Sequence, residues 1–142
     1  MQSTTPGTTS RAPDREAPPC CAYDWSPMRL VALIERQQLP LSTEKHMQAE
    51  LERVLRGQGI PFDRERALTP RDIPDFFVRG GVVIECKLRG KHTKMDVFRQ
   101  LARYAENDAV SAMILVTNMS MGLPQAVGGK PAYFASVSRS WL

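Results

Sequence analysis

The feature that most constrains the fold is the segment 73–87, Ile-Pro-Asp-Phe-Phe-Val-Arg-Gly-Gly-Val-Val-Ile-Glu-Cys-Lys. Two apolar runs flank a glycine pair, which is the pattern of a β-hairpin. The second run, 82–84, is apolar at consecutive positions, as is typical of a strand covered on both faces. This strand ends in Glu-x-Lys, and burying two such charges is costly unless they pair with each other or bind a metal ion.

The length of the hairpin loop decides which side chains meet. A two-residue loop would set Phe76 opposite Glu85 and Asp75 opposite Cys86. A three-residue loop over 79–81, a common type with glycine in the left-handed position, keeps the apolar side chains on matching faces. A shift by one residue would invert every side chain, so the pattern favours the second register. That register pairs Phe76 with Ile84 and Val78 with Val82, and it makes the Asp75 and Glu85 carboxylates adjacent.

Asp75, Glu85 and Lys87 form a candidate metal site. Residues two apart on a strand point to the same face, so Glu85 and Lys87 lie together. Adjacent carboxylates repel each other unless one is protonated or a cation lies between them, and their oxygens suit Mg²⁺ or Mn²⁺. An exposed hairpin end with an ordinary Glu–Lys pair is the alternative. Asp75, the glycine turn and the apolar run together favour the metal site, which suits the hydrolysis of phosphodiesters.

At these residues the chain resembles the PD-(D/E)xK nuclease superfamily. That superfamily includes restriction enzymes, Holliday-junction resolvases, RecB-type nuclease domains and small phage nucleases. The likeness covers roughly residues 42–137, and it rests on Pro74-Asp75, on Glu85-Cys86-Lys87, and on Gln100-Leu101-Ala102-Arg103-Tyr104, which is similar to the QxxxY element of RecB-type domains. Small phage-type members also carry an Arg-Glu-x-x-Leu element, which stands here at 64–68.

The resemblance implies an α/β fold with a restriction-endonuclease-like αβββαβ core, in which helices flank a mixed central sheet. It implies that Asp75 and Glu85 bind Mg²⁺ or Mn²⁺, helped by the Cys86 backbone carbonyl. Lys87 would position or deprotonate the attacking water, and Gln100 would complete the catalytic set. The implied function is a metal-dependent nuclease that hydrolyses DNA phosphodiester bonds, more readily as an endonuclease than as an exonuclease. RNA stays open as a substrate.

A glutamate on the first core helix is implied to act through the outer shell of the metal. That helix is predicted from Ser42 or Thr43 to about Gly57 or Gly59. At 100° per residue, Glu44 lies about 20° from Leu51, near the middle of the apolar stripe, and Glu50 lies about 100° away. An acid on the core face needs an explanation, so Glu44 is the candidate. A first-turn acid favoured by the helix dipole is an equally good reading of it.

The charge distribution favours a nucleic-acid partner. The net charge is +4, and the segment 79–103 alone holds seven bases against two acids, a balance of +5. Such a cluster fits a phosphate backbone. A non-catalytic nucleic-acid-binding module on the same fold is the alternative function, and a structural or assembly protein is a weaker one. The residues expected to contact nucleic acid are Arg66, Arg89, Lys91, Lys94, Arg99, Arg103 and Tyr104.

A length of 142 residues suits one domain, with too little chain beyond the core for strong sequence specificity. Residues 1–25, rich in Ser, Thr and Pro, are predicted to be a disordered tail. Residues 26–39 are predicted to be a short accessory helix that packs on the core or on a partner chain, and residues 40–142 the nuclease domain.

No segment resembles a signal peptide or a membrane span, so a cytoplasmic location is expected, with a homo-oligomer or protein partner left open. Further elements are predicted as strands over 60–68, 73–78, 82–88, 112–117 and 132–137, the last at an edge, and as a helix over 93–107.

Overall fold

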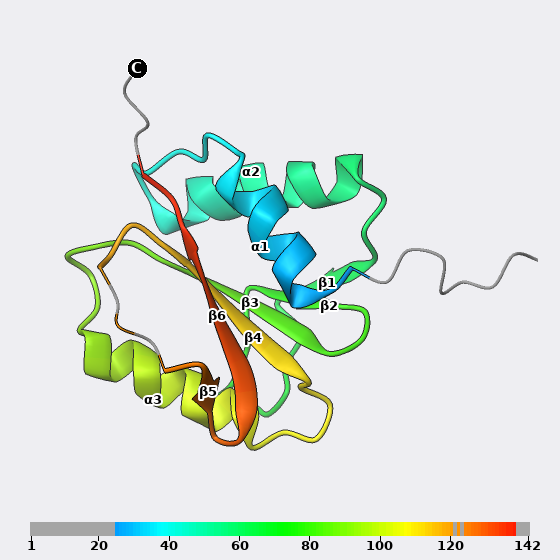
Figure 1. Ribbon diagram of the computed structural model, residues 1–142, viewed down its shortest axis with the longest axis vertical. Coiled ribbons are helices and arrows are strands. Elements are labelled where there is room, and N and C mark those ends of the chain that lie inside the picture. Colours follow the sequence, from blue (N-terminus) through cyan, green and yellow to red (C-terminus); the bar gives the residue numbers. More distant parts are fainter. Residues whose placement is uncertain (1–24, 121, 123, 139–142) are drawn as a thin grey trace, which may run out of the picture.

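The computed structural model describes residues 25–120, 122 and 124–138, so the predicted tail lies outside the described residues except for Trp25. Three helices flank one mixed sheet of six strands, which confirms the α/β class (Figure 1). The strand order across the sheet is β1-β2-β3-β4-β6-β5. The elements are α1 (Pro27–Glu35), α2 (Glu44–Gly57), β1 (Phe62–Arg64), β2 (Phe76–Val78), β3 (Val82–Lys87), α3 (Lys94–Ala105), β4 (Ala112–Thr117), β5 (Ala126–Val127) and β6 (Lys130–Ser136).

The β2–β3 hairpin has the predicted three-residue register. Phe76 faces Ile84 and Val78 faces Val82 in an antiparallel ladder. Gly81 has a positive φ of 89°, and a side chain there would meet the Ala109 carbonyl at 2.3 Å. Glycine is therefore required at this position both for the turn and for close packing against the start of β4.

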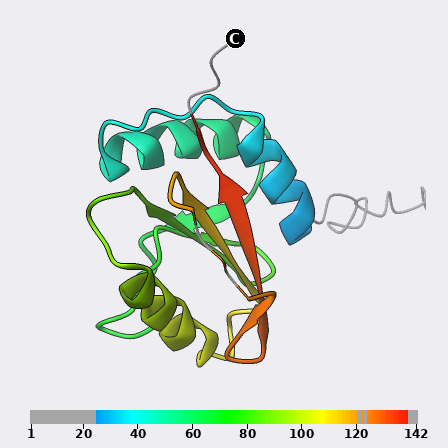
Figure 2. The same cartoon turned by 60° about the vertical axis from the view of Figure 1, so that its left-hand side comes forward.

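The sheet separates two apolar layers. Helices α1 and α2 lie on one side of it and α3 lies on the other, a division that is visible in both orientations (Figure 2). Strand β3 pairs with β4 in parallel along its full length, from Val82 and Ala112 to Lys87 and Thr117, and α3 forms the crossover between them. Alternate residues of β3 serve the two layers: Ile84 and Cys86 pack toward α1 and α2, and Val83 packs toward α3. The charged end of β3 therefore belongs to the α3 side.

The helices begin where the sequence predicts. Thr43 caps α2, and Thr93 caps α3 in a capping box with Asp96. Helix α1 begins after Ser26 but ends at Glu35, short of the predicted end at residue 39. Its buried side chains share one core with those of α2, so α1 packs on the core, which is one of the two placements expected for it. None of the helices in the described part of the chain is long and apolar enough to cross a membrane.

Two predicted strands are shorter than expected. Strand β1 ends at Arg64 because Glu65 adopts a positive φ of 49°, which turns the chain out of the ladder. Strand β2 begins at Phe76 instead of residue 73, since Pro74 has no N–H to contribute to a ladder. The last strand, β6, pairs with β4 in parallel, and β5 pairs only with its first two residues, so most of β6 lies at the sheet edge as predicted.

Candidate active site

The site lies where the hairpin ladder ends. The last backbone pair is Phe76 with Ile84. The Glu65 N–H donates to the Asp75 carbonyl at 3.2 Å. Asp75 and the other odd-numbered residues of this segment therefore point their backbone N–H and C=O groups toward β1. Because backbone groups alternate between neighbours, the even-numbered residues of β2 bond to β3.

Pro74 would therefore be the next backbone partner, opposite Cys86. A proline cannot donate a hydrogen bond to the Cys86 carbonyl. The Cys86 N–H donates to the Asp75 carboxylate oxygen Oδ2 at 2.8 Å, so a side chain replaces the backbone acceptor. The Cys86 carbonyl points to the same side of β3 as its N–H, toward Asp75. This end of the ladder supplies one carboxylate and one backbone carbonyl.

The Asp75 and Glu85 carboxylates are brought together, as the register predicts. Glu85 Oε2 accepts a hydrogen bond from the Asp75 backbone N–H at 3.3 Å. Glu85 is buried, with 3% of its surface exposed, whereas Asp75 is half-buried. These two carboxylates are neighbours at the end of the hairpin, and Glu85 is almost inaccessible to water. Their charges therefore repel each other strongly when both are ionised.

Three further side chains hold Glu85 in place. Lys87 Nζ lies 3.2 Å from Glu85 Oε1, and the Tyr104 hydroxyl donates to Glu85 Oε2 at 3.0 Å. The Gln100 amide in turn donates to the Tyr104 hydroxyl oxygen at 2.9 Å. Gln100 and Tyr104 are one helical turn apart on α3, so the helix presents both to the end of β3.

Burial and mutual repulsion change the acidity of this cluster. Burial and, after it, the Asp75 charge raise the pKa of Glu85 to about 7, against the opposing effects of Lys87 and Tyr104. Burial also raises the pKa of Asp75 to about 6, although the Cys86 N–H and the Lys87 charge act to lower it. The pKa of Tyr104 is raised, first by burial and then by Glu85, so its hydroxyl stays a donor.

Glu44, on α2, lies close to this pair of acids. Its Oε1 accepts from the Leu88 backbone N–H at 3.2 Å and lies 2.7 Å from His92 Nε2. Its charge also acts to raise the pKa of Asp75, which shows that the two acids are neighbours. Glu50 instead pairs with Arg53 at 3.1 Å on the exposed side of α2. Of the two candidate acids on this helix, Glu44 and Glu50, only Glu44 lies at the candidate site.

The donor set fits a hard divalent cation. Such a cation takes oxygen ligands, and two carboxylates with a backbone carbonyl would leave positions for water. Asp75, Glu85 and the Cys86 carbonyl could supply these oxygens. In the described part of the chain, no three His, Cys, Asp or Glu side chains form a metal-binding group. A cation here would therefore depend on the backbone oxygen as well as on the two acids.

A basic cavity of about 340 Å³ opens beside Lys87. Arg103 on its wall is fixed by Asp72 at 2.9 Å. Arg99 is exposed, and Asp96 is already used in the helix cap. Cations outnumber acids in this lining, so the cavity suits a phosphate group. It is lined by Lys87, His92, Asp96, Val97, Arg99, Gln100 and Arg103.

The predicted nucleic-acid contacts are dispersed around the site. Arg89, Lys91 and Lys94 are exposed in the loop that links β3 to α3 and on its first helical turn. Arg66 lies on a different segment, with its guanidinium 4.4 Å above the Phe77 ring. Tyr104 corrects the expectation: it is fully buried and bonded to Glu85, so it cannot contact nucleic acid at the surface.

Three contributors went unnoticed in the sequence. His92 reaches Glu44 across 48 residues, Asp72 holds Arg103, and Arg64 donates to the Asp75 carbonyl at 3.0 Å. His92 and Asp72 are lone polar residues in loops that no local pattern marks, and Arg64 stood out only as the first residue of the Arg-Glu-x-x-Leu element.

None of the protein-family models, curated proteins or solved structures compared with this chain matches it.

Proposed function

We propose that the protein is a metal-dependent nuclease that hydrolyses DNA phosphodiester bonds with little sequence specificity. The observation that carries the proposal is the corner formed by Asp75, Glu85 and Lys87. Two adjacent carboxylates have raised pKa values, an ammonium lies 3.2 Å from one of them, and the lysine that carries it lines a basic cavity. Groups shifted in this way cluster at functional sites.

The fold supports the proposal through the order of its elements. Helix α2, strands β1 to β3, helix α3 and strand β4 follow one another in the αβββαβ order expected of a restriction-endonuclease-like core. The two acids and the lysine stand at the end of the second and third of these strands. On this proposal, α1 and β6 extend the core on its α2 side and at the sheet edge.

Each residue has a proposed task. Asp75, Glu85 and the Cys86 carbonyl would hold Mg²⁺ or Mn²⁺, which supplies Lewis acidity and lowers the pKa of water. Lys87 orients the attacking water and offsets charge on the phosphate. Tyr104 and Gln100 orient Glu85, while Glu44 and His92 hold the loop after β3. Arg99 and Arg103 bind phosphate in the cavity.

The test is cleavage of supercoiled, linear and branched DNA in Mg²⁺, Mn²⁺ or EDTA. Wild type is compared with Lys87→Ala and Asp75→Ala, and with Lys45→Ala as the matched control, because Lys45 is an exposed lysine on α2. Metal-dependent cutting should fall at least about 100-fold in the first two variants, the size seen when a preorganised group at a reacting centre is removed. Cutting that survives in both variants would sink the assignment.

A non-catalytic nucleic-acid-binding module is the second candidate. One observation favours it: the described structure already supplies donors to both Glu85 oxygens, through Lys87, Tyr104 and Asp75. On this reading the acids only organise the sheet end. DNA binding without cutting, unchanged by EDTA and by Asp75→Ala, would support the module.

A further inference from the structure

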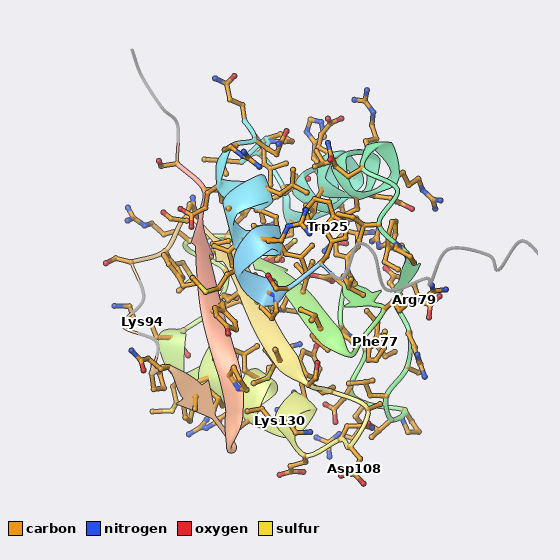
Figure 3. All side chains as sticks on the ribbon, turned by 45° about the vertical axis from the view of Figure 1, so that its right-hand side comes forward. Trp25, Phe77, Arg79, Lys94, Asp108 and Lys130 are labelled. Atoms are coloured by element: carbon orange, nitrogen blue, oxygen red, sulfur yellow. The ribbon has the colours of Figure 1, made fainter. Side chains whose placement is uncertain are left out.

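A second cavity, of about 420 Å³, lies at the other end of β2, beside the hairpin turn and the β1 edge. Figure 3 labels Phe77 and Arg79 on this side of the molecule, with Lys94 far across from them. The volume falls in the range of small-ligand pockets. It would admit one nucleotide but not a duplex. Its walls are Pro61, Phe62, Asp63, Arg66, Phe77, Arg79 and Gly80.

The cavity has a cationic, flat wall. The Arg66 guanidinium carbon lies over the Phe77 ring, 4.4 Å from its centroid, and the exposed part of this side chain is open to a ligand. Asp63 lies 3.7 Å from Arg66, but both side chains are largely exposed, at 66% and 48%, so this pair is weakly held. An arginine plane stacked on an aromatic ring is a surface on which a nucleobase can stack.

Arg79 supplies a second cation to the same cavity. Its backbone N–H is bonded to the Pro61 carbonyl at 3.0 Å, which fixes the start of the turn. Its side chain is exposed and makes no ion pair or hydrogen bond within the described residues. Such a guanidinium suits a phosphate of the strand whose base lies on Arg66.

The cavity and the candidate active site share one side of the sheet. Asp75, Phe77 and Arg79 alternate with the residues that face α2, so all three belong to the α3 side. At about 3.3 Å per residue, Arg79 lies about 13 Å from Asp75. That separation matches about four nucleotides of a stacked strand at about 3.4 Å each, and fewer of an extended one.

From this arrangement we propose that the cavity binds one unpaired nucleotide of the substrate strand, a few nucleotides from the bond that is cut. The base stacks on Arg66 and the phosphate contacts Arg79. The proposal rests on the proposed function for the kind of polymer bound. It adds a preference for DNA with a single-stranded flank over a fully paired duplex.

The test is fluorescence anisotropy of the full chain in EDTA, so that binding is measured without cutting. The probes are a labelled blunt duplex and the same duplex with a short single-stranded extension on either strand. Wild type should bind at least one extended probe about tenfold more tightly than the blunt one, the size expected for one stacked base. Arg66→Gln and Arg79→Gln should abolish this preference, and Arg79→Gln should leave blunt-duplex binding within about twofold of wild type.

Two variants sharpen the outcome. Arg66→Lys keeps the positive charge but removes the planar guanidinium group. If base stacking causes the preference for the extended probe, this variant should also lose that preference. Arg53→Gln, an arginine 77% exposed on α2, should change nothing. A wild type without preference, or equal losses on blunt and extended probes, would overturn the inference. If wild type cuts DNA but does not prefer the extended probe, only the nuclease proposal is supported. If it prefers the extended probe but never cuts DNA, only the nucleotide-binding role of the cavity is supported.

Discussion

The two faces of β3 have opposite characters. Toward α1 and α2, Ile84, Cys86 and Leu88 continue an apolar layer to the end of the strand. Toward α3, the same strand ends in Glu85 and Lys87, which are buried beside Tyr104. One face gains stability from burial, whereas the other buries charge against the desolvation penalty. A short strand can therefore be both a core element and the base of a site, because alternate residues face different layers.

The largest expected effect is on the apolar face. Ile84→Ala removes a fully buried side chain from the layer against α2, and should lower the free energy of unfolding by about 2–5 kcal/mol. Urea denaturation followed by circular dichroism measures it. Glu85→Gln, next to it on the opposite face, should not lower stability at pH 8 in EDTA. If the two substitutions destabilised the protein equally, the contrast between the faces would be wrong.

The second effect is a pH dependence that belongs to the charged face. The pKa values of Glu85 and Asp75 are raised to about 7 and about 6 in the folded protein, so the folded state binds protons more tightly than the unfolded chain. Their contribution to stability is thus full below about pH 4 and is lost as the pH rises through 6 to 7. The loss should reach at most about 3 kcal/mol for each acid.

The difference in unfolding free energy between wild type and Glu85→Gln measures the part of this contribution that depends on Glu85. Measured in EDTA from pH 4.5 to 8, the unfolding free energy of wild type should fall relative to that of Glu85→Gln as the pH rises. Millimolar Mg²⁺ should return stability to wild type at pH 8 but not to Glu85→Gln. If the difference in unfolding free energy does not change with pH in EDTA, burial does not raise the pKa values of these acids.

A smaller effect tests the support of Glu85 by α3. Tyr104→Phe removes the hydroxyl that donates to Glu85 and should cost about 1 kcal/mol of stability. This hydrogen bond acts to lower the pKa of Glu85, so its loss should raise that pKa further. Titration of the Glu85 carboxyl by NMR measures the shift. An unchanged pKa would mean that the hydroxyl does not act on the acid.

The smallest effect separates the two candidate acids of α2, Glu44 and Glu50. Glu44→Gln weakens the contacts to His92 and the Leu88 N–H and should cost about 1 kcal/mol. Glu50→Gln removes only an exposed pair with Arg53 and should stay within about 0.5 kcal/mol. Thermal denaturation of the two variants side by side measures the difference. Equal values would place Glu44, like Glu50, outside the site.

Much of this architecture was determined by the sequence alone. Periodicity and caps located the helices that begin after Thr43 and Thr93, and the glycine turn with face matching set the hairpin register that joins Asp75 to Glu85. These features depend on neighbours in the chain, where a repeat of two or 3.6 residues and a capping side chain act directly. The strand ends were less predictable, because Glu65 leaves the ladder through a backbone angle that no propensity demands.

Only the tertiary structure decided which distant groups complete the corner. It brought His92 to Glu44 across 48 residues, set Arg103 against Asp72, and buried Tyr104 on Glu85 instead of at the surface. The stacking of Arg66 on Phe77 beside Arg79 also arises from packing between segments. Such contacts carry no local signature, because they follow from how α2, α3 and two loops meet the end and the edge of one sheet. The chain's local pattern thus determined the paired acids, and packing determined what surrounds them.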